Sequence, residues 1–146
     1  MRRGANGMIR HNFNAKYVPL DAVEFIKKEK VTGNMFNNDE FGDYIIYSAW
    51  PKYRAFIDGR TDMYGAARVK EYLKISQAET GWKSVAEKYN ITRVLHDPNS
   101  VLSMVLMKER KLIYSNNIAN VFVNALPEYE EIIQKYPTVK PFKKEK

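Results

Sequence analysis

Segments with helical spacing of apolar residues alternate with short apolar runs along this chain, and this alternation constrains the fold most strongly. Leu20, Val23 and Ile26 fall on one face of a helix that we expect from about residue 20 to residue 30. The run 34–37 predicts a strand that ends in a polar loop. Because strands that alternate with helices favour a parallel core sheet, the pattern predicts an α/β fold.

The same patterning continues toward the C-terminus. Two more buried strands are expected, at 53–57 and 93–96, and each ends in a polar loop. The segments 111–115 and 118–124 predict an antiparallel hairpin, because asparagine, which tolerates the positive φ of tight turns, joins them. Further helices are expected at about 41–48, 64–75, 81–89, 100–108 and 127–136.

Together these elements predict a three-layer α/β/α sandwich with a small mixed sheet, in which parallel core strands are joined by a C-terminal antiparallel hairpin. The chain has 146 residues, of which 45% are hydrophobic, and this is enough for one core. We expect residues 1–16 to be a linker or stalk after a membrane region, residues 17–125 to form the α/β domain, and residues 126–146 to supply a C-terminal helix and a basic tail.

The composition argues against several kinds of site. The chain has no cysteine, and its two histidines, His11 and His96, do not have the spacing of metal ligands, so we expect no metal and no cofactor. It has no glycine-rich phosphate loop and no nucleophile elbow, and we assign no catalytic residue. The net charge is +7, but the basic residues lie at the chain ends and on mixed helix faces, so we expect no nucleic-acid partner.

Two polar loops follow predicted strands, at the sheet edge where open α/β folds bind ligands. The candidate substrate-binding residues in and beside these loops are Asp39, Glu40, Asp58, Arg60, Asp62 and Tyr64. Carboxylates, a guanidinium and a phenol on one edge suit a polar ligand such as a sugar or a phosphate. The same residues could instead cap helices and pair with one another, so the sequence leaves both interpretations open.

Aromatic residues near the second predicted helix have two interpretations. Tyr44, Tyr47, Trp50 and Tyr53 could form a platform for a sugar ring, but their helical and strand spacing is more typical of core and rim positions. His96 lies at a predicted strand end, where we expect a structural role.

The stretch from Val18 to Gly65 resembles the C-terminal soluble domain of bacterial polytopic membrane proteins that are similar to the GT-C superfamily of glycosyltransferases. Its most specific parts are GNMFNNDEFGDYIIY and FIDGRTDMYG, and the resemblance extends over about residues 17–124. It implies an extracytoplasmic (periplasmic) domain, attached to the membrane-embedded part of the same polypeptide. The implied reaction is sugar transfer from a polyprenyl-phosphate donor to an acceptor such as a glycan, with this domain accessory and not catalytic alone.

A more distant similarity is to the catalytic subunit of oligosaccharyltransferase, whose soluble domain carries the motif WWDYG. Glu40, Phe41 and Gly42 fall where that motif has Asp-Tyr-Gly, whereas Asn38 and Asp39 stand in place of its two tryptophans. Because of this departure, recognition of an Asn-X-Ser/Thr acceptor is not implied.

Two other functions remain open from the sequence. One is a free-standing module that binds a small sugar or anion with the same polar loops. The other is a structural protein–protein interaction domain, whose contact surface would be the apolar face of the last helix at Ile132 and Ile133. The first predicts saturable ligand binding, and the second predicts dimers or capture of a partner protein.

Overall fold

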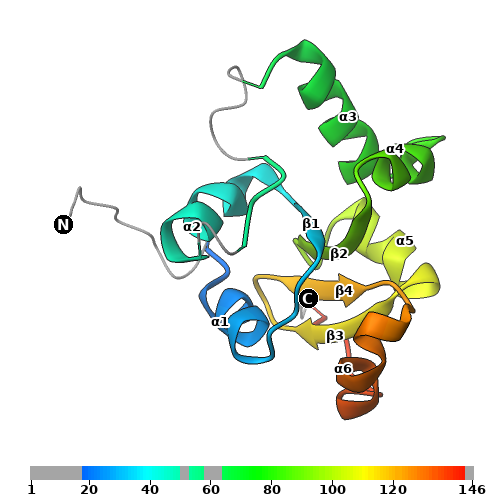
Figure 1. The fold of residues 1–146 in the computed structure, drawn as a ribbon. Helices are drawn as coiled ribbons and strands as arrows, with labels where there is room; N and C mark the ends of the chain where they lie inside the picture. The colour runs from blue at the N-terminus through cyan, green and yellow to red at the C-terminus, as the bar shows by residue number, and fades with distance from the viewer. Residues whose placement is uncertain (1–17, 50–52, 58–63, 144–146) are drawn as a thin grey trace.

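A computed structural model describes residues 18–49, 53–57 and 64–143, and it has helices on both sides of one sheet (Figure 1). In chain order its elements are α1 Leu20–Lys28, β1 Asn34–Asn37, α2 Asp39–Ala49, α3 Ala66–Ser76, α4 Trp82–Lys88, β2 Ile91–His96, α5 Val101–Glu109, β3 Lys111–Ser115, β4 Asn120–Val123, the 3-10 helix η2 Pro127–Tyr129 and α6 Glu130–Lys135. Most of these match the segments predicted from hydrophobic spacing, within a few residues at their ends.

The sheet has four strands in the order β1-β2-β4-β3. β1 and β2 are parallel, with Phe36 opposite Val94. β4 is antiparallel to both β2 and β3, and β3 and β4 are the predicted hairpin. The prediction of an α/β fold with a small mixed sheet, parallel core strands and a C-terminal antiparallel hairpin is therefore confirmed.

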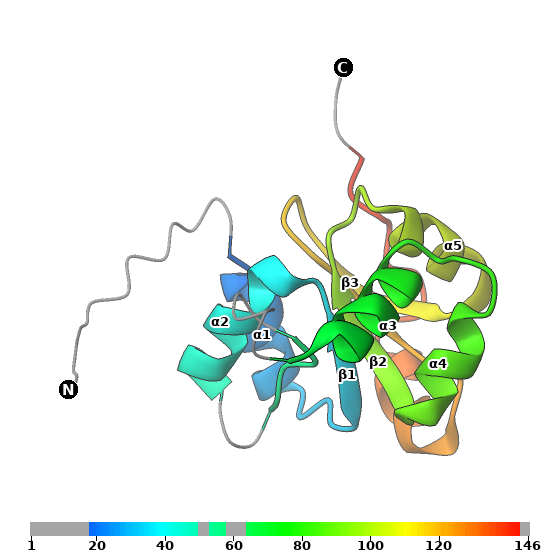
Figure 2. The same cartoon turned by 90° about the horizontal axis from the view of Figure 1, so that it is seen from above.

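Hydrophobic clusters fill both spaces between the sheet and its helices. Because side chains alternate along a strand, Phe36, Val94 and Phe122 face one cluster while Leu95 and Val121 face the other. The cluster around Leu95 packs against α1 and α2, and the cluster around Phe122 packs against α3, α4 and α5. The helices thus form two layers around the sheet (Figure 2).

The prediction of a strand at 53–57 is wrong, although the predicted burial is right. Tyr53, Phe56 and Ile57 are buried, but the segment has irregular backbone. The side chain of Asn37 takes the place of a neighbouring strand: its Oδ1 accepts from the Phe56 N–H at 2.7 Å, and its Nδ2 donates to the Ile57 carbonyl at 2.8 Å. These backbone groups are therefore satisfied without a ladder of backbone hydrogen bonds.

The C-terminal part packs onto the same sheet. Tyr129 is buried in the cluster that α1 and α2 cover, and Ile132 and Ile133 pack against that cluster. The face proposed as a contact for a partner protein is thus partly covered by the chain's own core.

No helix in the described parts, 18–49, 53–57 and 64–143, combines the length and the hydropathy needed to cross a bilayer.

Candidate functional site

The parallel strands β1 and β2 end side by side, since Asn37 pairs with Leu95 and His96 follows. Helix α2 begins directly after this edge, and Asp39 and Glu40 occupy its first turn. Acidic side chains are favourable there because the N–H groups of a helix start carry partial positive charge. The structure therefore places these two predicted residues at the carboxyl edge of the parallel strands, as the sequence analysis expected.

A small hydrogen-bond network holds the two carboxyls. The Tyr72 hydroxyl on α3 accepts from the Asp39 N–H at 3.0 Å and donates to Asp39 Oδ1 at 3.4 Å. Asn38 Nδ2 donates to Glu40 Oε1 at 3.0 Å. Asn38 Oδ1 is buried and has no hydrogen-bond partner within the described residues. Because buried acceptors are almost always paired, this oxygen is an exception within the described residues.

The two carboxyls interact, and their pKa values shift in opposite directions. Burial, and then the hydrogen bond with Glu40, raise the pKa of Asp39 to about 6. The hydrogen bond with Asp39 lowers the pKa of Glu40, although partial burial opposes this change. Asp39 is therefore the first of the two carboxylates to take up a proton as the pH falls, and Glu40 stays charged to a lower pH. At neutral pH such a pair accepts hydrogen bonds from hydroxyl groups of a polar ligand, and below about pH 6 Asp39 can also donate one.

His96, the last residue of β2, is buried next to this edge. It is 2% exposed, and its Nδ1 and Nε2 lie 2.8 Å and 3.3 Å from the hydroxyl oxygens of Ser100 and Ser76. Its ring stacks on Phe36 with centroids 5.9 Å apart. Burial lowers the pKa of His96 to about 4, so the ring is neutral at neutral pH. These contacts agree with the structural role expected for it.

The other predicted residues have different outcomes. Asp58, Arg60 and Asp62 lie outside the described residues. Tyr64 is partly buried and packs against the cluster that α3, α4 and α5 cover. Of the six, only Asp39 and Glu40 are seen in contact with each other in the part of the chain that the structure describes.

The aromatic residues do not form one described platform. Tyr44 and Tyr53 are buried in the cluster beneath α1 and α2. Tyr47 is 60% exposed, with its ring centroid 6.3 Å from that of Tyr44. Trp50 lies outside the described residues. The core interpretation therefore holds for Tyr44 and Tyr53.

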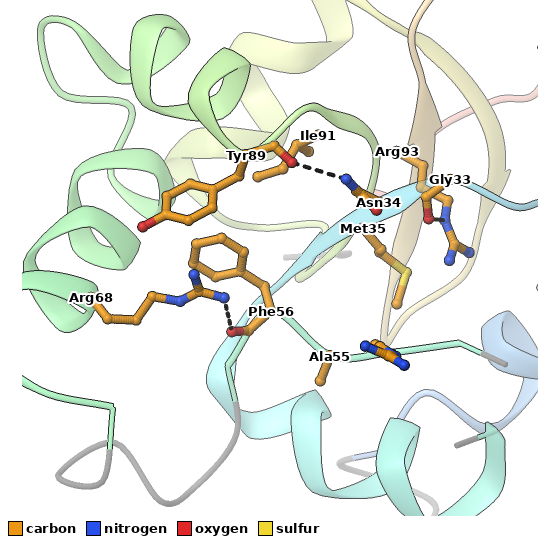
Figure 3. Close-up of a pocket in the computed structure, with 10 residues that line it drawn as sticks. Gly33, Asn34, Met35, Ala55, Phe56, Arg68, Tyr89, Ile91 and Arg93 are labelled. Carbon is orange, nitrogen blue, oxygen red and sulfur yellow. Dashed lines mark hydrogen bonds between the residues drawn. The ribbon is translucent and has the colours of Figure 1, made fainter. Parts of the chain in front are cut away.

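A separate pocket, with a volume of about 520 Å³, lies along the amino-terminal part of β1 (Figure 3). Its lining residues are Gly33, Asn34, Met35, Arg54, Ala55, Phe56, Arg68, Tyr89, Ile91 and Arg93. None of the six predicted residues is among them. This pocket could not be predicted from the sequence because its residues come from separate segments, and the one available signal was a charged residue, Arg93, in the middle of a buried strand.

Comparisons with known proteins add no relative: no family model, curated protein or solved structure matches this chain. Within residues 18–49, 53–57 and 64–143, no group of three or more histidine, aspartate or glutamate side chains is placed to hold a metal ion. The function has to be inferred from the geometry and from the resemblance of the sequence.

Proposed function

We propose that this chain is the soluble, extracytoplasmic C-terminal domain of a GT-C-like membrane glycosyltransferase that uses a lipid-phosphate-linked sugar. In this proposal the domain helps to bind or position the acceptor, and it is not catalytic alone. The transfer reaction itself takes place in the membrane-embedded part of the same polypeptide.

One observation carries the proposal: the two segments on which the resemblance is most specific meet at Asn37. This residue belongs to GNMFNNDEFGDYIIY, and its side chain binds Phe56 and Ile57, which begin FIDGRTDMYG. Asn37 is fully buried, and its Nδ2 also donates to the Asn38 carbonyl at 2.8 Å. Ile57, the last described residue before the second polar loop, is therefore fixed at the edge that presents Asp39 and Glu40.

The chemistry of this edge suits an acceptor with several hydroxyl groups. The carboxylates of Asp39 and Glu40 provide several acceptors, and a proton taken up by Asp39 below about pH 6 adds one donor. Sugars are bound in proteins through such mixed donors and acceptors. An accessory role needs only binding and orientation, which lower the barrier by holding the acceptor in place.

The test uses the full-length parent protein in membranes. We expect Glu40→Gln, and separately the pair Asp58→Asn with Arg60→Ala, to lower kcat/KM for sugar transfer by about tenfold, as for loss of a charge-assisted hydrogen bond. Glu87→Gln, on the exposed side of α4, is the matched control. Unchanged transfer by normally folded variants would remove these residues from the mechanism.

A free-standing module that binds a small ligand is the alternative. An antibody against the domain, applied to fractionated cells, separates the two proposals. A large product in the integral-membrane fraction supports the transferase, whereas a product with the mass of this chain in the soluble fraction contradicts it. In the second case, ligand binding by the isolated chain becomes the leading function.

A further inference from the structure

The pocket along β1 is strongly basic. Arg54, Arg68 and Arg93 line it, and the ten described residues of its lining include no aspartate or glutamate. These arginines come from three distant segments: the stretch before the second polar loop, helix α3 and strand β2. Three cations that line one cavity create a positive potential that favours binding of an anion.

Arg93 is the most deeply buried of the three, at 3% exposure. Its Nε donates to the Gly33 carbonyl and its Nη1 to the Val31 carbonyl, both at 2.7 Å. Burial lowers its pKa to about 10, so the guanidinium is still charged at neutral pH. Both of these partners are neutral, whereas buried charges are usually paired with an opposite charge. A guanidinium has five N–H donors, so these two bonds leave others for a ligand.

Arg68 is held rigidly beside the same cavity. Its guanidinium carbon lies 3.9 Å from the centroid of the Phe56 ring and 4.6 Å from that of Tyr89. Its Nη2 donates to the Phe56 carbonyl at 3.0 Å (Figure 3). Its Nε is buried and has no hydrogen-bond partner within the described residues. Arg68 is thus preorganised, and its Nε–H donor has no acceptor among the described residues.

Glu71, an acidic residue that interacts with Arg68, makes its main contacts with other partners. Glu71 accepts from Lys88 Nζ at 2.6 Å and from the Tyr89 hydroxyl. The hydrogen bond with Lys88, followed by that with Tyr89, lowers the pKa of Glu71, and the charge of Arg68 contributes last. Glu71 therefore pairs mainly with Lys88, and it does not line the pocket.

We propose that this pocket binds a phosphoryl group, as a phosphate monoester or a diphosphate. Planar guanidinium groups match the oxygens of phosphate, and more than one cation favours a ligand with more than one negative charge. A volume of about 520 Å³ is within the range of small-molecule sites and admits more than a bare phosphate. The proposal goes beyond the transferase function and does not depend on it.

The test is a titration of the 146-residue chain with inorganic pyrophosphate, followed by ¹⁵N NMR of the arginine Nε–H groups and by calorimetry. We expect saturable binding that shifts the Arg68 Nε–H signal and weakens as salt is added. Arg54→Gln and Arg68→Gln should each weaken binding about tenfold or more. Arg110→Gln, outside the pocket lining, is the control and should bind like the unchanged chain.

A second arm identifies the source of the phosphoryl group. The chain is mixed with phosphatidylcholine vesicles that contain or lack phosphatidic acid, and binding is measured by sedimentation. Pyrophosphate binding that Arg68→Gln weakens supports a free phosphorylated ligand, and vesicle binding with the same sensitivity supports a lipid headgroup. The proposal is overturned if neither probe binds, or if both folded pocket variants bind like Arg110→Gln. Circular dichroism establishes that each variant is folded. Neither readout measures glycosyl transfer, so failure of this proposal is distinguishable from failure of the transferase function.

Discussion

The two ends of strand β1 carry opposite charge. At the carboxyl end, the acidic side chains of Asp39 and Glu40 interact with each other next to Asn37. At the amino end, the pocket beside Gly33 and Asn34 is lined by arginines. The same irregular segment, 53–57, contacts both ends, because Asn37 binds its last two residues and its Arg54 faces the pocket.

This difference shows how the two kinds of site arise. The acidic edge comes from neighbours in sequence, since Asp39 and Glu40 are adjacent and follow directly from a strand end. The basic pocket comes from side chains far apart in sequence, which only packing brings together. We expect the segment 53–57 to link the two, so that changes at one end of β1 alter the other.

The largest effect is expected at Asn37. Its replacement by alanine leaves the buried Phe56 N–H and Ile57 carbonyl without their partners, and should lower the free energy of unfolding by about 3 kcal/mol. The matched control is Asn34→Ala at the other end of β1, which loses one exposed hydrogen bond to the Tyr89 carbonyl and should cost about 1 kcal/mol or less. Urea denaturation measures both. Equal losses would contradict the role assigned to Asn37.

A somewhat smaller loss is expected at the amino end from Gly33→Ala. Gly33 has a φ of +110°, and an added Cβ would overlap the hydroxyl oxygens of both Tyr129 and Thr92. Strain of this kind costs about 1–3 kcal/mol. Tyr129→Phe in the same chain removes one of these two oxygens, so the double variant should lose less than the sum of the two single changes. Additive losses in thermal unfolding would show that the overlap with Tyr129 is not the cause.

At the acidic edge, Glu40→Gln should bring the pKa of Asp39 down from about 6, because the hydrogen bond and charge of Glu40 raise it. Since the pKa of Asp39 is higher in the folded state, its contribution to stability falls as the pH rises from about 4 to about 6. That fall should be smaller in the variant. ¹³C NMR titration of the Asp39 carboxyl checks the pKa, with Glu87→Gln as control. A midpoint unchanged near 6 would assign the shift to burial alone.

The smallest change is expected from Tyr72→Phe, and it has the opposite sign. The hydrogen bond from Tyr72 lowers the pKa of Asp39, so its loss should raise that pKa further. The same carboxyl titration measures the change. Tyr114→Phe is the control, since the Tyr114 hydroxyl accepts from Asn116 on the hairpin. A lowered pKa of Asp39 would mean that the tyrosine acts mainly by burying the carboxyl.

Much of the fold could be predicted because its signals are local. The spacing of Leu20, Val23 and Ile26 predicts α1, and Asn116 and Asn117 predict the turn between β3 and β4. The acidic part of the site was also found, since a polar loop after a buried strand lies at the sheet edge. What could not be predicted was the backbone of 53–57, whose apolar pattern is the same for a strand and for a buried irregular segment.

The sequence by itself determined which segments are helical, which are buried, and that Asp39 and Glu40 lie together at a strand end. Tertiary structure alone decided that the Asn37 side chain replaces a strand partner for 53–57, and that Arg54, Arg68 and Arg93 meet in one pocket. The physical reason is the distance along the chain over which each kind of interaction acts. Hydrophobic period and capping act over one or two turns of chain, whereas side-chain hydrogen bonds and clustered charges depend on which distant segments the packing brings into contact.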